Sequence, residues 1–556
     1  MPDQYATTSH THTHTHTITV AAGIYAPGHL GELTRYLPFD LIDAVLEHTR
    51  TQQQRLRALP SRVGVYFVLA LNLFPHLGYA RVWDTLVAGL QSLPLPRPSQ
   101  AALVHLRRRL GPTPFKTLFQ TLAAPLAQPT TPGTRYRHWR TVAFDACHSI
   151  KAPDSARNLT WLRKICYQQG TEGYPRLQIT ALCETGTRSL LGATLTRAPS
   201  GEPDQARTLL DRLTPQMLVL ADQAYQGNTF LGEVADTGAQ LLIRLREHRR
   251  PRVETLLPDG SYLTHLDGLK LRIVQARITA TTQDGTQVRG VYRLATTLLD
   301  HRTDPARQLL ALYHERWEVE SAFYSLRHTL LHRRVLRSQD PAGLEQEVWA
   351  LLVLYQALRM PMVEAVESRP GTHADRAPFT TALNTARCQV ITAQQVLPDQ
   401  DAPGRGGGIV QAVRENLLPA RRARISARKL KCSHRRYREA DPERPLTTDR
   451  VQDLELEILA PAPEAVAGPQ QPAAKMAPGI RPGGSKERTM RLLGSDLSRG
   501  WSPIEVARAL DYPHYRSLAT QMGVWVQEGF LQRTAHGRYT LALRWAGVEL
   551  TAQRVP

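Results

Sequence analysis

The chain has 556 residues, of which 42% are hydrophobic, and this length favours about three or four globular domains over a single core. Its 69 Lys and Arg residues exceed its 49 Asp and Glu residues. The resulting formal charge of +20 favours a polyanionic partner, with nucleic acid ahead of a membrane surface. Five scattered cysteines without a CxxC pair argue against a disulfide framework or a zinc ribbon, and they fit a reducing cytoplasm. The longest apolar run, residues 63–74, is too short to span a bilayer, so we expect no membrane partner.

The first part of the chain combines a low-complexity tail with a helical region. Residues 1–27 include a stretch in which His alternates with Thr, and we expect a disordered tail. Adventitious metal binding by these histidines is the alternative. Residues 28–130 show helical patterns, one of which ends at Gly111 and Pro112. We therefore predict a helical N-terminal domain.

From residue 135 the pattern changes to β-prone runs separated by turns. The predicted elements are a strand, a hairpin, a helix and a further strand, at residues 139–147, 176–198, 202–213 and 216–225. Asp145 and Asp222 are expected at strand ends, where a side chain reaches the rim of a sheet. Residues 249–300 add at least two more alternating runs. We therefore predict an α/β domain over residues 131–340 with a β-rich insertion.

A helix predicted at about residues 305–331 gathers four polar residues on one side. At about 100° per residue, Tyr313, Arg316, Glu320 and Arg327 fall within an arc of about 60°. An apolar stripe beside them is expected to face the core. From this segment alone, a solvated ion-pair face is the alternative interpretation.

The chain thus carries three candidate metal ligands, Asp145, Asp222 and Glu320. Three carboxylates brought together repel one another unless divalent cations neutralise them. Oxygen-only ligands select Mg²⁺ or Mn²⁺, and two such ions about 4 Å apart suit phosphodiester chemistry. Taken singly, each Asp is also explained as a turn starter.

The helix sequence resembles a family signature. The bacterial DDE transposases of insertion-sequence family four carry Tyr, two residues, Arg, three residues, Glu, six residues and then Lys or Arg. Tyr313, Arg316, Glu320 and Arg327 have this spacing, and Trp317 completes the "RW" dipeptide of the family.

Two further segments resemble the same family in the same order. "FDACHSIKAPDSARN" resembles the segment around its first catalytic Asp, and "LVLADQAYQ" the segment around its second, which implies these roles for Asp145 and Asp222. Residues 249–300 contain no Trp, whereas certain hairpin-forming relatives stack a flipped base on one there. Tyr262 and Tyr292 are available instead, and a place in the sheet core is the preferred interpretation of both.

The resemblance implies a ribonuclease H-like core with two Mg²⁺ or Mn²⁺ ions and an activity that cleaves and joins DNA at the ends of an insertion sequence. It further implies that residues 28–130 bind the DNA ends, that the partner is double-stranded DNA, that the chain forms a homodimer in the synaptic complex, and that it acts in the bacterial cytoplasm at the nucleoid. A decayed or recruited transposase acting as a DNA-binding repressor is the alternative, and a structure-specific nuclease is a third option.

Cations account for most of the candidate DNA contacts. Residues 341–450 are predicted to be helical and then strongly basic, although a solvated tail explains such a charge run as well. In the catalytic region and this basic part, the candidate DNA-binding residues are Tyr313, Arg316, Arg327, Arg333, Arg334, Arg428, Lys429 and Lys431.

The C-terminal end reads as a linker and a small module. Residues 451–487 are rich in Pro, Ala and Gly, which predicts an extended linker. In residues 488–556, a helix with a capping box, a second helix and a hairpin resemble a winged helix. Arg516 and Gln521 on the second helix are candidate DNA contacts, with a protein-binding role of the module as the alternative.

Overall fold

The computed structural model divides into two units, Met1–Val466 and Ala467–Pro556, which are treated separately below. It describes residues 29–55, 59–90, 95, 97–164, 166–167, 170–171, 173–198, 200–246, 248–393, 408–420, 424–426, 448–461, 485–512, 515–534 and 538–542. The His-rich tail and the predicted DNA contacts Arg428, Lys429 and Lys431 lie outside the described residues.

The N-terminal region is helical, as the sequence pattern predicted. Its α-helices are α2 (Leu33–Tyr36), α3 (Phe39–His48), α4 (Ser61–Leu73), α5 (Tyr79–Val87), α6 (Gln100–Leu110) and α7 (Thr113–Leu122). The Ser99 hydroxyl caps α6 by accepting from the Ala102 N–H, and Gly111 ends it with a φ of +63°. Helix α4 is apolar around its circumference and is buried almost throughout, as the 63–74 run predicted.

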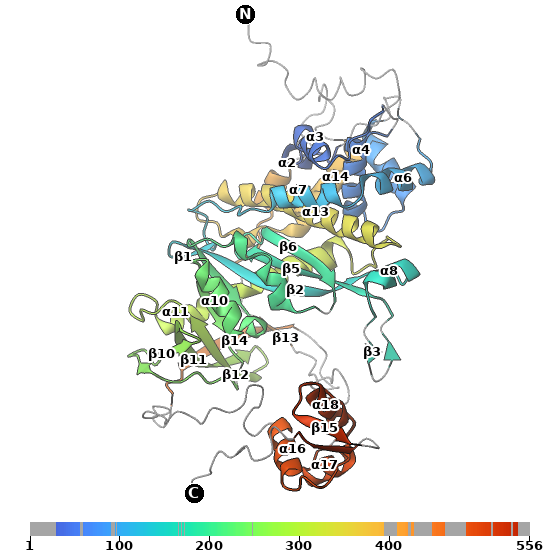
Figure 1. Cartoon of the computed structure of the whole chain (residues 1–556). Helices are drawn as coiled ribbons and strands as arrows, with labels where there is room; N and C mark the ends of the chain where they lie inside the picture. The colour runs from blue at the N-terminus through green and yellow to red at the C-terminus, as the bar shows by residue number, and fades with distance from the viewer. Residues whose placement is uncertain are drawn as a thin grey trace, which may run out of the picture. The chain divides into compact units, whose positions relative to one another are not determined.

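Helix α13 (Pro341–Glu367) is the central helix of the first unit. Asp340 caps it by accepting from the Gly343 N–H, and Pro341 occupies the first helical position, where its missing N–H costs nothing. By length and composition α13 could cross a membrane, but 89% of its most apolar window is buried against other parts of the protein. It is therefore a core helix, packed against α4, α7 and the later helices α14 (Phe379–Thr392) and α15 (Ile409–Glu415) (Figure 1).

A large mixed sheet lies below these helices in Figure 1. Its main path is β13-β14-β11-β12-β8-β7-β2-β5-β6. The strands on it are β2 (Trp139–Lys151), β5 (Arg176–Glu184), β6 (Leu190–Arg197), β7 (Met217–Ala221), β8 (Gln240–Arg244), β11 (Leu269–Thr282), β12 (Gln287–Thr296), β13 (Arg424–Ser426) and β14 (Thr448–Ile458). Strands β2, β7 and β8 run parallel, whereas β5 and β6 run antiparallel to their neighbours. The short strands β1 (Arg135–Tyr136), β9 (Thr255–Leu256) and β10 (Tyr262–Leu266) pair at its margins, and β3 (Cys166–Tyr167) and β4 (Gly170–Thr171) form a separate pair.

The two faces of this sheet have different cores. On one face, α10 (Asn228–Asp236) contributes Phe230, which meets Phe144 of β2, and the short α9 (Glu202–Arg207) packs on the same side. On the other face, Ala143 of β2 shares a cluster with α13 and with Val319 of the helix that carries Glu320. Adjacent side chains of a strand point to opposite faces of the sheet. Asp145 lies two residues after Ala143, so its side chain points to the same face as Ala143, toward the helix of Glu320.

The predicted β-rich segment 249–300 contains strands β9 to β12, and it extends the core sheet, because β12 pairs with β8 and β11 pairs with β12. One predicted boundary is corrected by the sheet. The predicted linker does not begin at residue 451, because Thr448–Ile458 form β14 and pair with β11. The physical reason is the alternation "LELEI" at 454–458, which places Leu456 and Ile458 against the core while the intervening Glu residues point outward. The Pro-, Ala- and Gly-rich composition that begins near residue 460 led the prediction to include this strand in the linker.

The helix predicted over 305–331 is interrupted. It consists of α11 (Ala306–Tyr313), a 3₁₀ turn η4 (His314–Arg316), α12 (Trp317–Tyr324) and a π-helical turn η5 (Ser325–Leu330). A π turn holds more residues than an α turn and is common at functional sites.

The second unit folds around its own apolar core. Its described elements are α16 (Ser485–Gly494), α17 (Pro503–Ala509), α18 (Tyr515–Gln527), β15 (Leu531–Thr534) and β16 (Arg538–Leu541). Ser502 and Glu505 form the expected capping box, and the α18 residues Leu518, Met522 and Trp525 are buried as expected. Gln521 is exposed, and the side chain of Arg516 lies outside the described residues.

Candidate active site

The strand register brings Asp145 and Asp222 together. Each paired β2 residue lies opposite the β7 residue 77 positions later in the chain, from Arg140 with Met217 to Ala143 with Leu220. Asp145 and Asp222 continue this register, one step beyond the end of β7. Neighbouring strands lie about 4.8 Å apart, so the two carboxylates occupy the same level of the sheet.

Arg316 joins Asp145 to Glu320. Its Nη1 lies 3.5 Å from Asp145 Oδ2, and its Nη2 donates to Glu320 Oε1 at 2.6 Å. The Arg316 side chain is only 7% exposed, whereas that of Glu320 is 39% exposed. The geometry therefore gathers Asp145, Arg316 and Glu320 at one place, with Glu320 reaching toward solvent.

The electrostatic environment of Asp145 favours a cation. Burial raises the pKa of Asp145 to about 7, against the opposing effect of Arg316, and the nearby carboxylates of Glu320 and Asp222 raise it further. Its Oδ1 accepts from the Ala146 N–H at 2.8 Å, and Asp222 Oδ1 accepts from the Ala224 N–H at 2.7 Å. Both Asp side chains are thus held by the backbone beside them.

The three acids provide the donor chemistry of a hard divalent cation, because all their ligand atoms are carboxylate oxygens. The negative charges of Glu320 and Asp222 raise the pKa of Asp145, and a bound cation would offset this repulsion. Among the described residues, however, no three His, Cys, Asp or Glu side chains converge as a ready metal site. The guanidinium of Arg316 lies between two of the three acids in this arrangement.

Tyr313 and Arg316 do not lie on the surface as the predicted phosphate contacts would require. Tyr313 is 5% exposed, and its hydroxyl donates to the carbonyl oxygen of Ala221 at 3.2 Å. Burial raises the pKa of Tyr313 well above its ordinary value, so it remains a neutral donor. Since Ala221 directly precedes Asp222, Tyr313 fixes the end of β7. In this structure, Tyr313 holds the backbone next to Asp222, and Arg316 forms ion pairs with Asp145 and Glu320.

The remaining predicted cations lie further along the same segment. Arg327 donates from Nη1 to the hydroxyl of Ser149, which returns this segment to β2 four residues beyond Asp145. Arg333 and Arg334 are exposed.

A buried ion pair behind the site was not predicted. Glu318 of α12 is fully buried and pairs with Arg188, which follows β5 with a φ of +60°. The Tyr355 hydroxyl of α13 donates to the Arg188 carbonyl oxygen at 2.7 Å. Glu318 lies on the side of the helix opposite Glu320 and outside the apolar stripe, so the helical pattern did not signal its burial.

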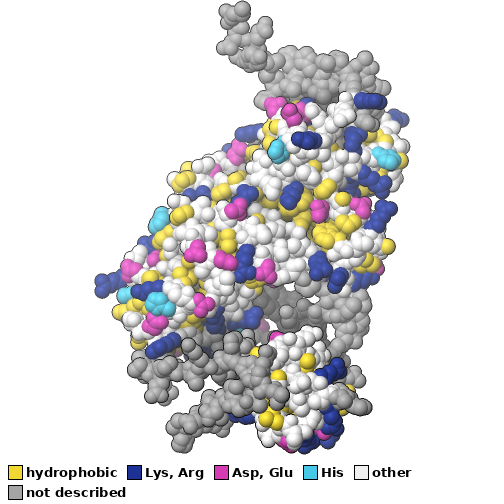
Figure 2. Space-filling view, viewed as in Figure 1, with side chains coloured by type: hydrophobic (Ala, Val, Ile, Leu, Met, Phe, Trp, Pro, Cys, Tyr) yellow, Lys and Arg dark blue, Asp and Glu magenta, His cyan; other side chains and the backbone are white. Residues whose placement is uncertain are grey.

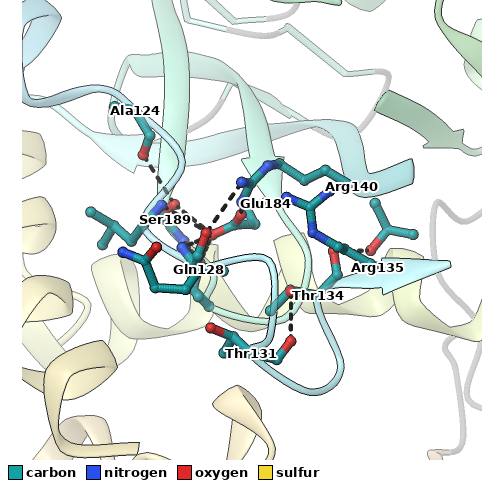
Figure 3. A network of polar contacts seen from close by, with 12 residues as sticks. Ala124, Gln128, Thr131, Thr134, Arg135, Arg140, Glu184 and Ser189 are labelled. Carbon is teal, nitrogen blue, oxygen red and sulfur yellow. Dashed lines mark hydrogen bonds and ion pairs between the residues drawn. The ribbon is translucent and has the colours of Figure 1, made fainter. Parts of the chain in front are cut away.

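A second buried carboxylate ties the helical region to the sheet. Glu184, at the end of β5, is fully buried and pairs with Arg140 of β2 (Figure 3). The same carboxylate accepts from the Leu126 and Ala127 N–H groups at 3.2 Å, in the segment that follows α7. Because several donors converge on it, this charge is satisfied and holds the two regions in register.

Comparisons with known proteins agree with the geometry. A model described as "Insertion element 4 transposase N-terminal" matches residues 27–120, and one described as "Transposase DDE domain" matches residues 140–356, which include all three acids. Transposase InsG for insertion sequence element IS4 of Escherichia coli (strain K12) is 24% identical over 420 residues, covering 72% of this chain and 92% of that protein. The cryo-EM structure of the piggyBac transposase synaptic complex with hairpin DNA aligns at a TM-score of 0.36 and 10% identity, over 70% of this chain and 84% of that one.

Proposed function

Since this chain belongs to the DDE transposases of insertion-sequence family four, we propose that Asp145, Asp222 and Glu320 are its metal ligands and catalytic residues. The chain is a transposase, an enzyme of metal-dependent DNA cleavage and strand transfer. The observation that carries the residue assignment is the register of β2 with β7 together with the Arg316 bridge to Glu320.

Divalent ions, Mg²⁺ or Mn²⁺ and two in number, would supply a nucleophile and stabilise the leaving oxygen of the phosphodiester. Asp145, Asp222 and Glu320 would hold them. The fixed backbone contacts of the two Asp side chains keep these ligands in place, while the more exposed Glu320 faces the DNA.

Arg316 has a supporting role in this proposal. Its guanidinium offsets the repulsion between Asp145 and Glu320 before cations bind. Arg327, Arg333 and Arg334 are proposed to contact DNA phosphates, since they follow Glu320 on the same segment and Arg333 and Arg334 are exposed. On the face shown in Figure 2, Lys and Arg side chains are spread widely, with Asp and Glu side chains among them.

A ribonuclease H-like core is supported by the strand order. Numbered along the chain, the five core strands β2, β5, β6, β7 and β8 lie in the order 3-2-1-4-5, with the second strand antiparallel to the first. We further propose a homodimer in the synaptic complex and a winged-helix role for residues 488–556, which the helices and terminal hairpin of the second unit support.

The two tyrosines of the extended hairpin differ. Tyr262 is 3% exposed and belongs to the core, as expected. Tyr292 is half-buried: the Arg244 guanidinium lies 4.1 Å from its ring centre, and its ring meets Tyr313 edge-on. Because Arg244 covers one of its faces, Tyr292 is a poor stacking surface there for a flipped base.

The test is cleavage of the DNA that flanks the gene, with Mg²⁺ or Mn²⁺ present and the ends mapped. Glu320→Gln is expected to abolish cleavage, because it removes a metal ligand, while DNA affinity stays within a few-fold, because binding rests on cations. Glu315→Gln on the preceding turn is the control and should keep cleavage. Full cleavage by the Glu320→Gln variant would refute the catalytic assignment. A repressor needs none of the three acids and is not favoured.

A further inference from the structure

An exposed aromatic pair follows Glu320 on the same helical segment. Tyr324 is 57% exposed, and its ring lies parallel to that of His328, with ring centres 4.4 Å apart and an interplanar angle of 4°. Arg333 continues the arrangement, since its Nε donates to His328 Nδ1 at 2.6 Å. Tyr324, His328 and Arg333 are called the stacking platform below.

The backbone around this platform departs from regular helix at two points. The π turn Ser325–Leu330 separates Tyr324 from the end of the segment, and the Leu331 N–H donates to the Leu326 carbonyl oxygen at 3.0 Å. His332 and Arg333 then both adopt positive φ values, of 49° and 58°. Such conformations are strained for non-glycine residues and concentrate at functional sites. Here they accompany the return of Arg333 to the edge of the His328 ring, where its Nε meets Nδ1.

The platform has the chemistry of a nucleobase site. Aromatic rings and guanidinium planes stack bases of any sequence, and neighbouring cations hold the phosphates on either side. The Nδ1 atom of His328 accepts a hydrogen bond from Arg333, so the imidazole is neutral. Burial, together with the charges of Arg327 and Arg333, lowers the pKa of His328. The platform therefore combines two aromatic rings with the guanidinium of Arg333, and the cations Arg327 and Arg334 are its neighbours in the chain.

Its position fixes which part of the DNA could reach it. Tyr324 lies four residues after Glu320, about 6 Å along a helix axis at 1.5 Å per residue. Successive nucleotides of one strand are spaced by about 3.4 Å, so the platform is about two nucleotides from a phosphate at Glu320.

We propose that Tyr324, His328 and Arg333 bind one unpaired base of the DNA, within about three nucleotides of the phosphate that is cut. The proposal rests on the assignment of Glu320 to the reaction centre. Stacking on the exposed face of Tyr324 holds a base out of the duplex, and the cost of unpairing it is offset by that stacking.

The test compares matched and mismatched DNA ends. The full chain is bound, with Ca²⁺ present, to duplexes of the terminal sequence that flanks the gene, with a single mismatch moved through the nucleotides around the cut. A mismatch removes the cost of unpairing, so the wild-type chain should prefer one mismatched position by about 5- to 100-fold. Tyr324→Ala should abolish this preference, and Tyr324→Phe should retain it, because phenylalanine keeps the ring. Arg334→Ala is the matched control and should weaken both duplexes equally.

Three outcomes would overturn the proposal: no mismatch preference at any position, a preference that survives in Tyr324→Ala, or one that is lost in Tyr324→Phe. A 5-iodouracil at the preferred position should also form a photo-crosslink to the segment containing Tyr324. These measurements use uncut DNA. If Glu320→Gln abolishes cleavage and the mismatch preference is absent, the platform alone fails. If Glu320→Gln still cleaves, the proposed function fails whatever the preference.

Discussion

Asp145 combines three features in one side chain: it is only 16% exposed, it lies beside two other carboxylates, and Arg316 balances only part of this charge. An acid whose folded-state pKa is about 7 keeps its proton in the native protein at pH values where the unfolded chain, with a pKa near about 3.9, has lost it. Stability of the metal-free protein should therefore fall as pH rises from about 4 to about 7 and level off above that.

The substitution Asp145→Asn removes this penalty. With EDTA present, the variant should be more stable than the wild type at pH 8 by about 1–3 kcal/mol, and the difference should vanish near pH 4. Denaturant unfolding at both pH values measures it. Asp211→Asn, at a side chain that is 73% exposed, is the control and should change little. A variant less stable than the wild type at pH 8 would contradict the proposed electrostatics.

The segment that carries Glu320 is held from behind by buried polar contacts as well as by its apolar face. Glu318 and Arg188 lie between α12 and the turn after β5, and Tyr355 of α13 holds the same turn. A buried charge without its partner is costly, so the pair fixes how α12 lies over the sheet.

Glu318→Gln should lower the free energy of unfolding by about 3 kcal/mol, because it leaves the Arg188 guanidinium buried without its counterion. Glu457→Gln is the comparison, since Glu457 pairs with Arg277 on the surface and is 60% exposed. That variant should lose no more than about 1 kcal/mol. Equal effects of the two substitutions in chemical denaturation would show that the buried pair does not stabilise α12.

Strand β14 covers the edge of β11, so we expect its removal to destabilise the sheet. A chain that ends after Val466 keeps β14 and should fold and retain metal-dependent cleavage, since all three acids precede it. A chain that ends before Thr448 exposes the β11 edge, and it should aggregate or melt at lower temperature. Light scattering and thermal unfolding compare the two. Indistinguishable behaviour would mean that β14 adds nothing to the core.

Across the whole molecule, sequence reasoning succeeded where a local pattern had a single physical meaning. The helical N-terminal region, the buried helix 63–74 and the capping box at Ser502 are examples. The strands of Asp145 and Asp222 were also predicted from the apolar residues before each acid, and Asp222 does follow the end of its strand. The predicted strand end at Asp145 was wrong, because β2 continues to Lys151 and Asp145 lies in its middle. The shared level of the two acids in the sheet required the parallel pairing of β2 and β7, which no local pattern specifies.

The failures have physical causes as well. Burial of Tyr313 and Arg316 was not foreseen, since helical spacing gives the side of a helix but not what packs against it, and their DNA contacts stay predictions. Strand β14 was missed because its alternation is short and its partner β11 lies far away in the chain. The Glu318–Arg188 pair joins residues 130 positions apart, so no local sequence pattern at either residue predicts it.

The central claim is that Asp145, Asp222 and Glu320 surround one divalent-metal site, and iron-directed cleavage of the protein backbone tests it most directly. Fe²⁺ bound in place of Mg²⁺ generates radicals that cut the chain near its ligands when ascorbate and peroxide are added. A chain that begins at residue 28 removes the His-rich tail as a competing site. Cuts are predicted near residues 145, 222 and 320, suppressed by excess Mg²⁺ or Mn²⁺ and lost in Asp222→Asn. Cuts that fall elsewhere, or that persist unchanged in this variant, would contradict the account.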